Sequence, residues 1–153
     1  MSYQKLTDHM SFYIEDQYSG FWEWDELLEK IYQISLRDGP TVKQIFEQEP
    51  ASGGKNQVAA IIKHLRDKLP EWIAPEGHNP REFGDKVMRA NLWFAEAAAG
   101  NFYMVQGEWN EPFLKQLGSF PISKHDDKID SVSGARVRLA PIFQWKKISF
   151  LSL

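Results

Sequence analysis

Three aspartates stand within five positions of the stretch SKHDDKID: Asp126, Asp127 and Asp130. If this stretch opens a helix, Asp130 shares a face with the other two, because residues three and four apart are neighbours on a helix surface. Helix capping accounts for one or two of them, since Ser123 precedes Asp126 by three residues, as in a capping box, and a helix N-terminus favours negative charge. It does not account for three, because neighbouring like charges repel unless a cation lies between them.

A second acidic position lies near the end of the predicted strand 41–49. Alternation along a strand places Ile45, Glu47 and Glu49 on one face, the side that a helix should cover. Chemistry in open α/β sheets collects at the carboxyl ends of strands, where Glu47 lies, although a solvated strand end is the alternative. Glu49 shares this face and is a reserve candidate.

Carboxylates from a strand end and a helix start suit magnesium or manganese, which prefer oxygen ligands. Two such ions about 3.5 to 4 Å apart can activate water and stabilise the leaving oxygen in phosphodiester hydrolysis. The chain has no cysteine, which excludes thiolate-bound zinc and disulfides. We therefore expect a two-metal site.

Predicted strands and helices alternate along the chain. Period-two apolar patterns predict strands, helical spacing predicts helices, and Gly and Pro mark their ends. The expected strands are 10–16, 41–49, 71–75 and 102–107, and the expected helices are 24–37, 55–68, 82–99, 110–118 and one from about residue 124. This alternation predicts an α/β fold with helices on the faces of a sheet. The tail 140–153 has only a weak pattern and is not assigned.

The composition is typical of one folded, soluble domain of 153 residues. No apolar run approaches the roughly 18 residues that span a bilayer, so we expect no membrane segment and a location inside the cell. The net charge of −3 offers no general attraction for nucleic acid. DNA contacts would need local basic residues, for which the candidates are Lys86 with Arg89 and Lys63 with Arg66, although solvated helix faces carry the same pattern.

Four stretches occur in an order that resembles a known family. They are QIFEQEPASGGK, an acidic strand end with a glycine turn; GDKVMRA, a helix start; AEAAAGNFYMVQGEW, a helix, glycine and strand; and FLKQLGSFPISKHDDKIDSVSGA, a Phe-Pro loop and His-Asp-Asp helix. Together they resemble the C-terminal nuclease domain of phage terminase large subunits, over residues 10–139. The resemblance implies one nuclease domain over 1–153, with a ribonuclease H-like fold: a central mixed sheet with helices on both faces.

The resemblance also implies a function: a metal-dependent endonuclease that cleaves double-stranded viral DNA during genome packaging, with two Mg²⁺ or Mn²⁺ ions. The implied catalytic residues are Glu47, Asp127 and Asp130; the implied metal ligands are Glu47, Asp126, Asp127 and Asp130; the implied DNA contacts are Lys86, Arg89 and His125. The implied partners are double-stranded DNA, the terminase ATPase domain, the small terminase subunit and the portal. The implied location is the cytoplasm of the infected bacterial host.

One feature departs from the family pattern. The family begins this domain with a strand that carries the first catalytic aspartate, and we expect that strand to be missing here, with Asp8 and Asp16 as weak substitutes. Two alternatives stay open. One is a resolvase-like or transposase-like nuclease with the same acidic helix. The other is a degenerate ribonuclease H-like module that binds DNA or a packaging partner without catalysis.

The aromatic residues allow two interpretations. Trp22, Trp24, Trp93, Phe94 and Trp109 could stack bases, as in single-strand binders, but most fall on apolar stripes and favour core packing. The GGK at 53–55 lacks the spacing of a phosphate-binding P-loop, so we expect no ATPase site.

Overall fold

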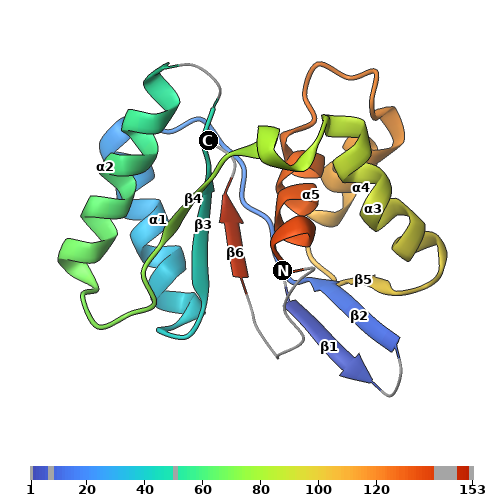
Figure 1. Cartoon of the computed structure of the whole chain (residues 1–153), viewed down its shortest axis with the longest axis horizontal. Helices are drawn as coiled ribbons and strands as arrows, with labels where there is room; N and C mark the ends of the chain where they lie inside the picture. The colour runs from blue at the N-terminus through green and yellow to red at the C-terminus, as the bar shows by residue number, and fades with distance from the viewer. Residues whose placement is uncertain (1, 7–8, 50–51, 140–147, 152–153) are drawn as a thin grey trace.

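The computed structural model describes residues 2–6, 9–49, 52–139 and 148–151 (Figure 1). These residues form an α/β structure in which five α-helices accompany short strands. The strands are β1 (Ser2–Leu6), β2 (His9–Ile14), β3 (Lys43–Glu47), β4 (Glu76–His78), β5 (Phe102–Met104) and β6 (Ile148–Leu151). The helices are α1 (Trp24–Asp38), α2 (Ser52–Lys68), the 3₁₀ helix η1 (Pro80–Phe83), α3 (Lys86–Ala98), α4 (Asn110–Ser119) and α5 (Asp127–Leu139).

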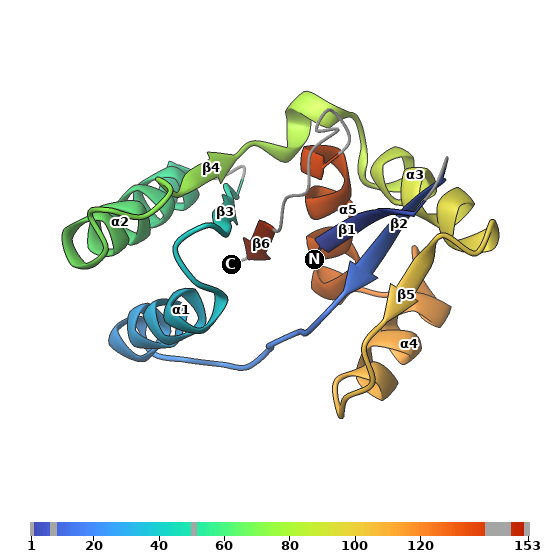
Figure 2. The same ribbon diagram turned by 90° about the horizontal axis from the view of Figure 1, so that it is seen from below.

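The described strands form two separate three-stranded sheets, where the sequence predicted one central mixed sheet. In the first, β2 pairs antiparallel with β1 and parallel with β5. In the second, β3 lies between β4 and β6 and is parallel to both. The sheets meet through side chains, because Phe12 of β2 and Ile45 of β3 share a core cluster with Ala135 and Leu139 of α5. Figure 2 shows α5 standing between the two halves of the molecule.

One half of the core packs α1 and α2 against β3. Glu23 and Glu26 form a capping box at the start of α1, and Gly39, with φ of 92°, follows its end, as the sequence pattern Asp-Gly-Pro predicts. The apolar stripe Val58, Ile61 and Leu65 of α2 is buried against Phe46, which confirms its helical spacing as a core face.

The other half of the core packs α3, α4 and α5 together. Trp93 is 3% exposed and donates a hydrogen bond from Nε1 to Ser133 Oγ at 3.0 Å. Its ring lies among those of Phe94, Phe102 and Phe113. Core packing is therefore confirmed for Trp93, whereas Trp22 and Trp24 lie at the surface, 38% and 37% exposed.

Several predicted element boundaries change in the structure. The strand predicted at 71–75 is wrong, since these residues form a turn and extended loop and β4 begins at Glu76. The helix predicted at 82–99 is two elements, because Gly84 takes a φ of 87° between η1 and α3. The sequence predicted that a strand before residue 10 is missing, yet β1 lies there and pairs with β2, although its residues SYQKL include no aspartate. Strand β6 lies in the tail that the sequence left unassigned. None of the described helices has the length and apolar character that a membrane span needs.

Candidate metal site at the end of β3

Glu47 faces α5 because of the alternation along β3. Phe46 points to the α1 and α2 side, whereas Ile45 packs against Ala135 and Leu139 of α5. Glu47 is two residues beyond Ile45 and therefore shares the α5 side. Two residues advance a strand by about 7 Å, and five residues advance a helix by about 7.5 Å. Asp130 lies five residues before Ala135 on α5, so we expect Glu47 to lie level with Asp130.

The start of α5 is held by a side chain from α4, so its aspartates are not needed as caps. Gln116 Oε1 accepts hydrogen bonds from the backbone N–H of Lys128, at 2.8 Å, and of Ile129, at 3.4 Å. The N–H of Lys128 is one of those that a helix start leaves without an intrahelical partner, whereas the N–H of Ile129 also donates to the Asp126 carbonyl oxygen at 2.9 Å. The Ser123 hydroxyl bonds within its own loop, to the backbone of His125, and so does not complete the expected capping box.

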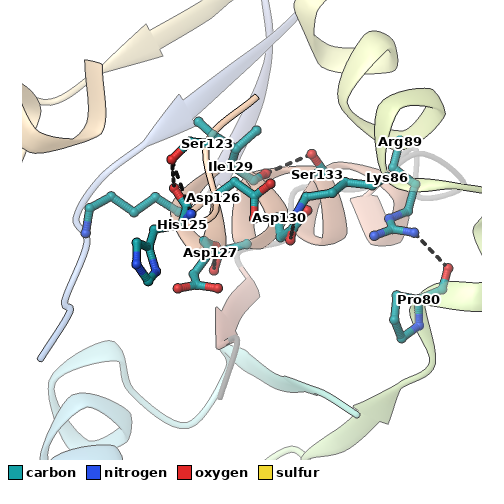
Figure 3. A network of polar contacts seen from close by, with 12 residues as sticks. Pro80, Lys86, Arg89, Ser123, His125, Asp126, Asp127, Ile129, Asp130 and Ser133 are labelled. Carbon is teal, nitrogen blue, oxygen red and sulfur yellow. Dashed lines mark hydrogen bonds and ion pairs between the residues drawn. The ribbon is translucent and has the colours of Figure 1, made fainter. Parts of the chain in front are cut away.

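Lys86 connects α3 to the aspartates of α5. Its Nζ forms ion pairs with Asp126 Oδ1 and, at 3.0 Å, with Asp130 Oδ2. In Figure 3, Lys86 reaches across to these two aspartates, whereas Asp127 and His125 extend away from it. Asp126 is only 6% exposed. The lysine therefore holds together two carboxylates that would otherwise repel each other.

The negative charge of Asp130 acts on Glu47. Burial, and then the negative charge of Asp130, raises the pKa of Glu47 to about 7. Burial also raises the pKa of Asp130, although its ion pair with Lys86 acts in the opposite direction. Burial works to lower the pKa of Lys86, but hydrogen bonds to Asp126 and Asp130 outweigh it and the pKa is raised. Lys86 is therefore an ammonium at neutral pH.

Two buried carboxylate oxygens have no hydrogen-bond partner among the described residues. They are Glu47 Oε2 and Asp130 Oδ1, on the strand end and the helix start that the sequence singled out. A buried anionic oxygen without a partner is costly, so either protonation or a nearby cation would stabilise each of these carboxylates. The part of the chain that the structure describes has no group of three or more His, Asp or Glu side chains that could hold a metal ion, so the magnesium or manganese site stays a prediction.

The other predicted site residues are dispersed around this pair. Asp127 is exposed, and so are His125 and Glu49, although the charge of Glu49 still reaches Glu47. Arg89 is 7% exposed and donates from Nη1 to the carbonyl oxygens of Pro80, at 3.2 Å, and Gly84, at 2.8 Å. This burial argues against the predicted DNA contact of Arg89 and gives it a structural role at the corner before α3.

The remaining candidates belong to other places. Lys63 pairs with Asp67 on the exposed side of α2, as expected for a solvated helix face. Asp16 pairs with Arg37 at 2.7 Å and lines a separate cavity of about 550 Å³ at the carboxyl ends of β2 and β5. Asp8 lies outside the described residues.

The sequence did not single out His78 or the contact of Lys86 with the aspartates. His78 pairs in register with Glu47 across the β3–β4 ladder, and burial lowers its pKa to about 4. Its only sequence signal is a position near the end of a three-residue strand. Lys86 follows Asp85, whose Oδ1 accepts a hydrogen bond from the backbone N–H of Met88 and so caps α3. The Asp-Lys pair in the sequence therefore marks the start of this helix.

Comparison of the chain with protein-family models, with curated proteins and with solved structures gives no match in any of the three. The resemblance to terminase nucleases therefore stays a prediction from the ordered sequence motifs.

Proposed function

We propose that this chain is a metal-dependent endonuclease domain that cleaves double-stranded DNA, of the ribonuclease H-like kind found in phage terminases. One observation carries the proposal. The negative charge of Asp130 raises the pKa of Glu47, which lies 83 positions away in the sequence, and each of these side chains has a buried oxygen without a described hydrogen-bond partner. Perturbed carboxylates gathered from distant segments are typical of functional sites.

The chemistry would depend on a divalent ion held by Glu47 and Asp130. Bound Mg²⁺ or Mn²⁺ lowers the pKa of a coordinated water and neutralises charge on a phosphodiester. Glu47 and Asp130 would position that ion, and Asp126 would hold Lys86 beside it. Asp127, exposed at the first position of α5, is free to meet a ligand that approaches from solvent.

The DNA would approach the start of α5. Lys124 and His125 are exposed there, next to the aspartates in the chain, and can contact phosphates. Lys86 can add to this field, since its side chain is 37% exposed. Double-stranded viral DNA as substrate, and an ATPase domain, small terminase subunit and portal as partners, follow from the resemblance alone.

One observation favours a second candidate, a DNA- or partner-binding module without catalysis. The single positive charge of Lys86 already pairs with Asp126 and Asp130, which reduces the negative charge available to hold metal. In such a module the ion pair would be a structural replacement for the metal.

A nicking assay tests the proposal. Supercoiled plasmid is incubated with the whole chain and Mn²⁺, alongside Glu47→Gln and Asp130→Asn, which keep side-chain shape but remove the charge. Because both residues are proposed to hold the ion directly, each variant should lose more than the roughly 10- to 100-fold that outer-shell changes cost. Asp67→Asn, an exposed carboxylate change on α2, is the matched control and should nick as the parent does.

The result separates the two candidates. Nicking by the parent and by Asp67→Asn, but not by the two site variants, supports the endonuclease. Absence of nicking by the parent, with DNA binding retained in a filter assay, supports the non-catalytic module. Equal nicking by parent and site variants would rule out Glu47 and Asp130 as the site.

A further inference from the structure

The segment between β2 and α1 and the start of α1 expose four aromatic side chains within seven positions. They are Tyr18, Phe21, Trp22 and Trp24, and Phe21 is fully exposed. The segment crosses from one half of the molecule to the other (Figure 2). Single exposed apolar residues are ordinary in a folded protein, but a group of them marks an interaction surface. These rings are therefore candidates for contact with a partner.

Contacts within the chain hold this segment in place. Ser19 Oγ accepts a hydrogen bond from Lys128 Nζ of α5 at 2.7 Å. A Cβ on Gly20 would lie 2.6 Å from Cζ2 of Trp22, so the indole of Trp22 folds back over Gly20. Phe21 therefore projects from an anchored loop.

The same segment is strongly acidic. Residues 15–26 contain five carboxylates and no Lys or Arg, and residues 106–111 contain two carboxylates and no Lys or Arg. The two segments line a common cavity of about 550 Å³, where Glu15, Asp16 and Glu108 lie with the indole of Trp109. Carboxylates and an aromatic face together suit a cationic group.

Three basic side chains contact this surface among the described residues. Arg37 pairs with Asp16 at 2.7 Å, and Lys128 reaches the segment from α5. Lys30 Nζ lies 5.0 Å and Arg37 Cζ 5.1 Å from the centre of the Tyr18 ring, so a ring of this surface already accepts cations. Seven carboxylates thus meet three cations, and the surface keeps an excess of negative charge.

This excess of charge decides which partner fits. Stacking of nucleic-acid bases on the rings would bring phosphates close to the carboxylates, which repel them. A second copy of the chain in a two-fold dimer would place the same carboxylates opposite each other. A basic protein segment avoids both conflicts, because guanidinium groups pair with carboxylates and stack on indoles, and apolar side chains between them can cover the exposed rings.

We propose that residues 15–24 and 106–109 form a docking surface for a basic, arginine-containing segment of a partner protein. An Arg side chain of that segment enters the cavity, where Glu108 pairs with it and Trp109 offers an aromatic face. Apolar side chains of the segment pack on Phe21 and Trp22. The inference goes beyond the proposed function and involves neither a metal ion nor Glu47.

Binding of a short fluorescent peptide in which Arg alternates with Leu tests this surface. Fluorescence anisotropy measures its affinity for the whole chain at low salt, with chelator present. Phe21→Ala and Glu108→Gln should each weaken binding by about fivefold or more, because the first removes an apolar anchor and the second a pairing charge. Both side chains are exposed, so circular dichroism should show the parent fold. Ile122→Ala and Glu71→Gln remove exposed side chains outside this surface; these matched controls should bind as the parent does.

The outcomes decide the inference in either direction. Weaker binding by both variants, with both controls equal to the parent, supports it. It is overturned if the parent does not bind the peptide, if either variant binds as the parent does, or if a peptide with Ser in place of Arg binds equally well. Phe21-dependent binding of a single-stranded oligonucleotide in place of the peptide would assign the rings to base stacking. Phe21-dependent dimerisation in light scattering would assign them to a second copy, and either result also overturns the inference.

This result is distinct from the outcome of the nicking assay. Glu47 lies outside the docking surface, so Glu47→Gln should bind the peptide as the parent does. Peptide binding without nicking by the parent would keep the docking surface and remove the endonuclease. Nicking that depends on Glu47, without peptide binding, would do the reverse.

Discussion

The two faces of β3 carry opposite chemistry within three residues. Phe46 on one face is fully buried against Ile31 of α1 and Val58 and Ile61 of α2. Ile45 and Glu47 on the other face lie toward α5, where an apolar contact gives way to carboxylates. The same strand therefore anchors a core on one side and places a charged group in a partly buried position on the other.

The difference shows how stability and function divide along the strand. Apolar burial on the Phe46 face stabilises the fold roughly in proportion to the area removed from water. On the Glu47 face, burial of carboxylates opposes folding unless a cation compensates them. Lys86 compensates Asp126 and part of Asp130, whereas Lys86 and Arg89 offset only part of the cost of ionising Glu47, whose Oε2 is buried without a described hydrogen-bond partner.

The largest expected effect comes from the apolar face. Phe46→Ala should lower the free energy of unfolding by about 3 to 5 kcal/mol, because it removes a buried ring and leaves a cavity. Phe21→Ala, at a fully exposed position, should stay within about 0.5 kcal/mol of the parent. Urea unfolding measures both. Similar losses from the two changes would contradict the placement of Phe46 in the core.

The elements that the sequence predicted well are those with a local periodic signal. The stripe Val58, Ile61 and Leu65 and the Gly39 stop after α1 depend on neighbouring residues, and the structure has both. The alternation of Ile45, Phe46 and Glu47 is also local, so the direction of Glu47 could be predicted without the fold. The acidic group at the start of α5 was visible for the same reason.

What the sequence missed depends on segments far apart. Lys86 and Arg89 have the spacing of one exposed basic face, yet Lys86 pairs with aspartates on α5 and Arg89 is buried on carbonyl oxygens. Nothing near them in the chain indicates those partners. Strand β6 pairs with β3 across about a hundred residues, and its own pattern is too short and weak to predict a partner.

Two neighbouring glycines, Gly53 and Gly54, lie in the first turn of α2. A Cβ on Gly54 would lie 2.6 Å from Glu49 Cβ and 2.7 Å from the Glu49 carbonyl oxygen, too close for contact with backbone. Gly54→Ala should therefore cost about 1 to 3 kcal/mol. A Cβ on Gly53 would meet nothing within 4 Å, so Gly53→Ala should stabilise α2 by up to about 1 kcal/mol.

Thermal unfolding of the two alanine variants checks this pair. The midpoint temperature of unfolding should be lower than that of the parent in Gly54→Ala and higher in Gly53→Ala. A loss of stability in Gly53→Ala as large as that in Gly54→Ala would show that the turn is not as tight as the structure has it.

The last expected effect on stability comes from the charged face, where a substitution should stabilise the fold in a way that depends on pH. The pKa of Glu47 is about 7 in the folded chain, above its ordinary value of 4.5, because burial and Asp130 oppose its ionisation. Below pH 4.5 the residue is protonated in both folded and unfolded chains and has no effect. As the pH rises from 4.5 to about 7, only the unfolded chain ionises readily, so stability falls.

Glu47→Gln removes this penalty. Without divalent ions it should be equal to the parent near pH 4 and more stable by about 1 to 2 kcal/mol at pH 8, a figure reduced for partial solvent screening. Urea unfolding in chelator across this range measures the difference. Added Mn²⁺ should reduce the difference in stability between Glu47→Gln and the parent, because an ion bound through Glu47 would stabilise only the parent. A variant less stable than the parent at pH 8 in chelator would mean that Glu47 already has a compensating partner, and that its face of β3 supports the fold as the Phe46 face does.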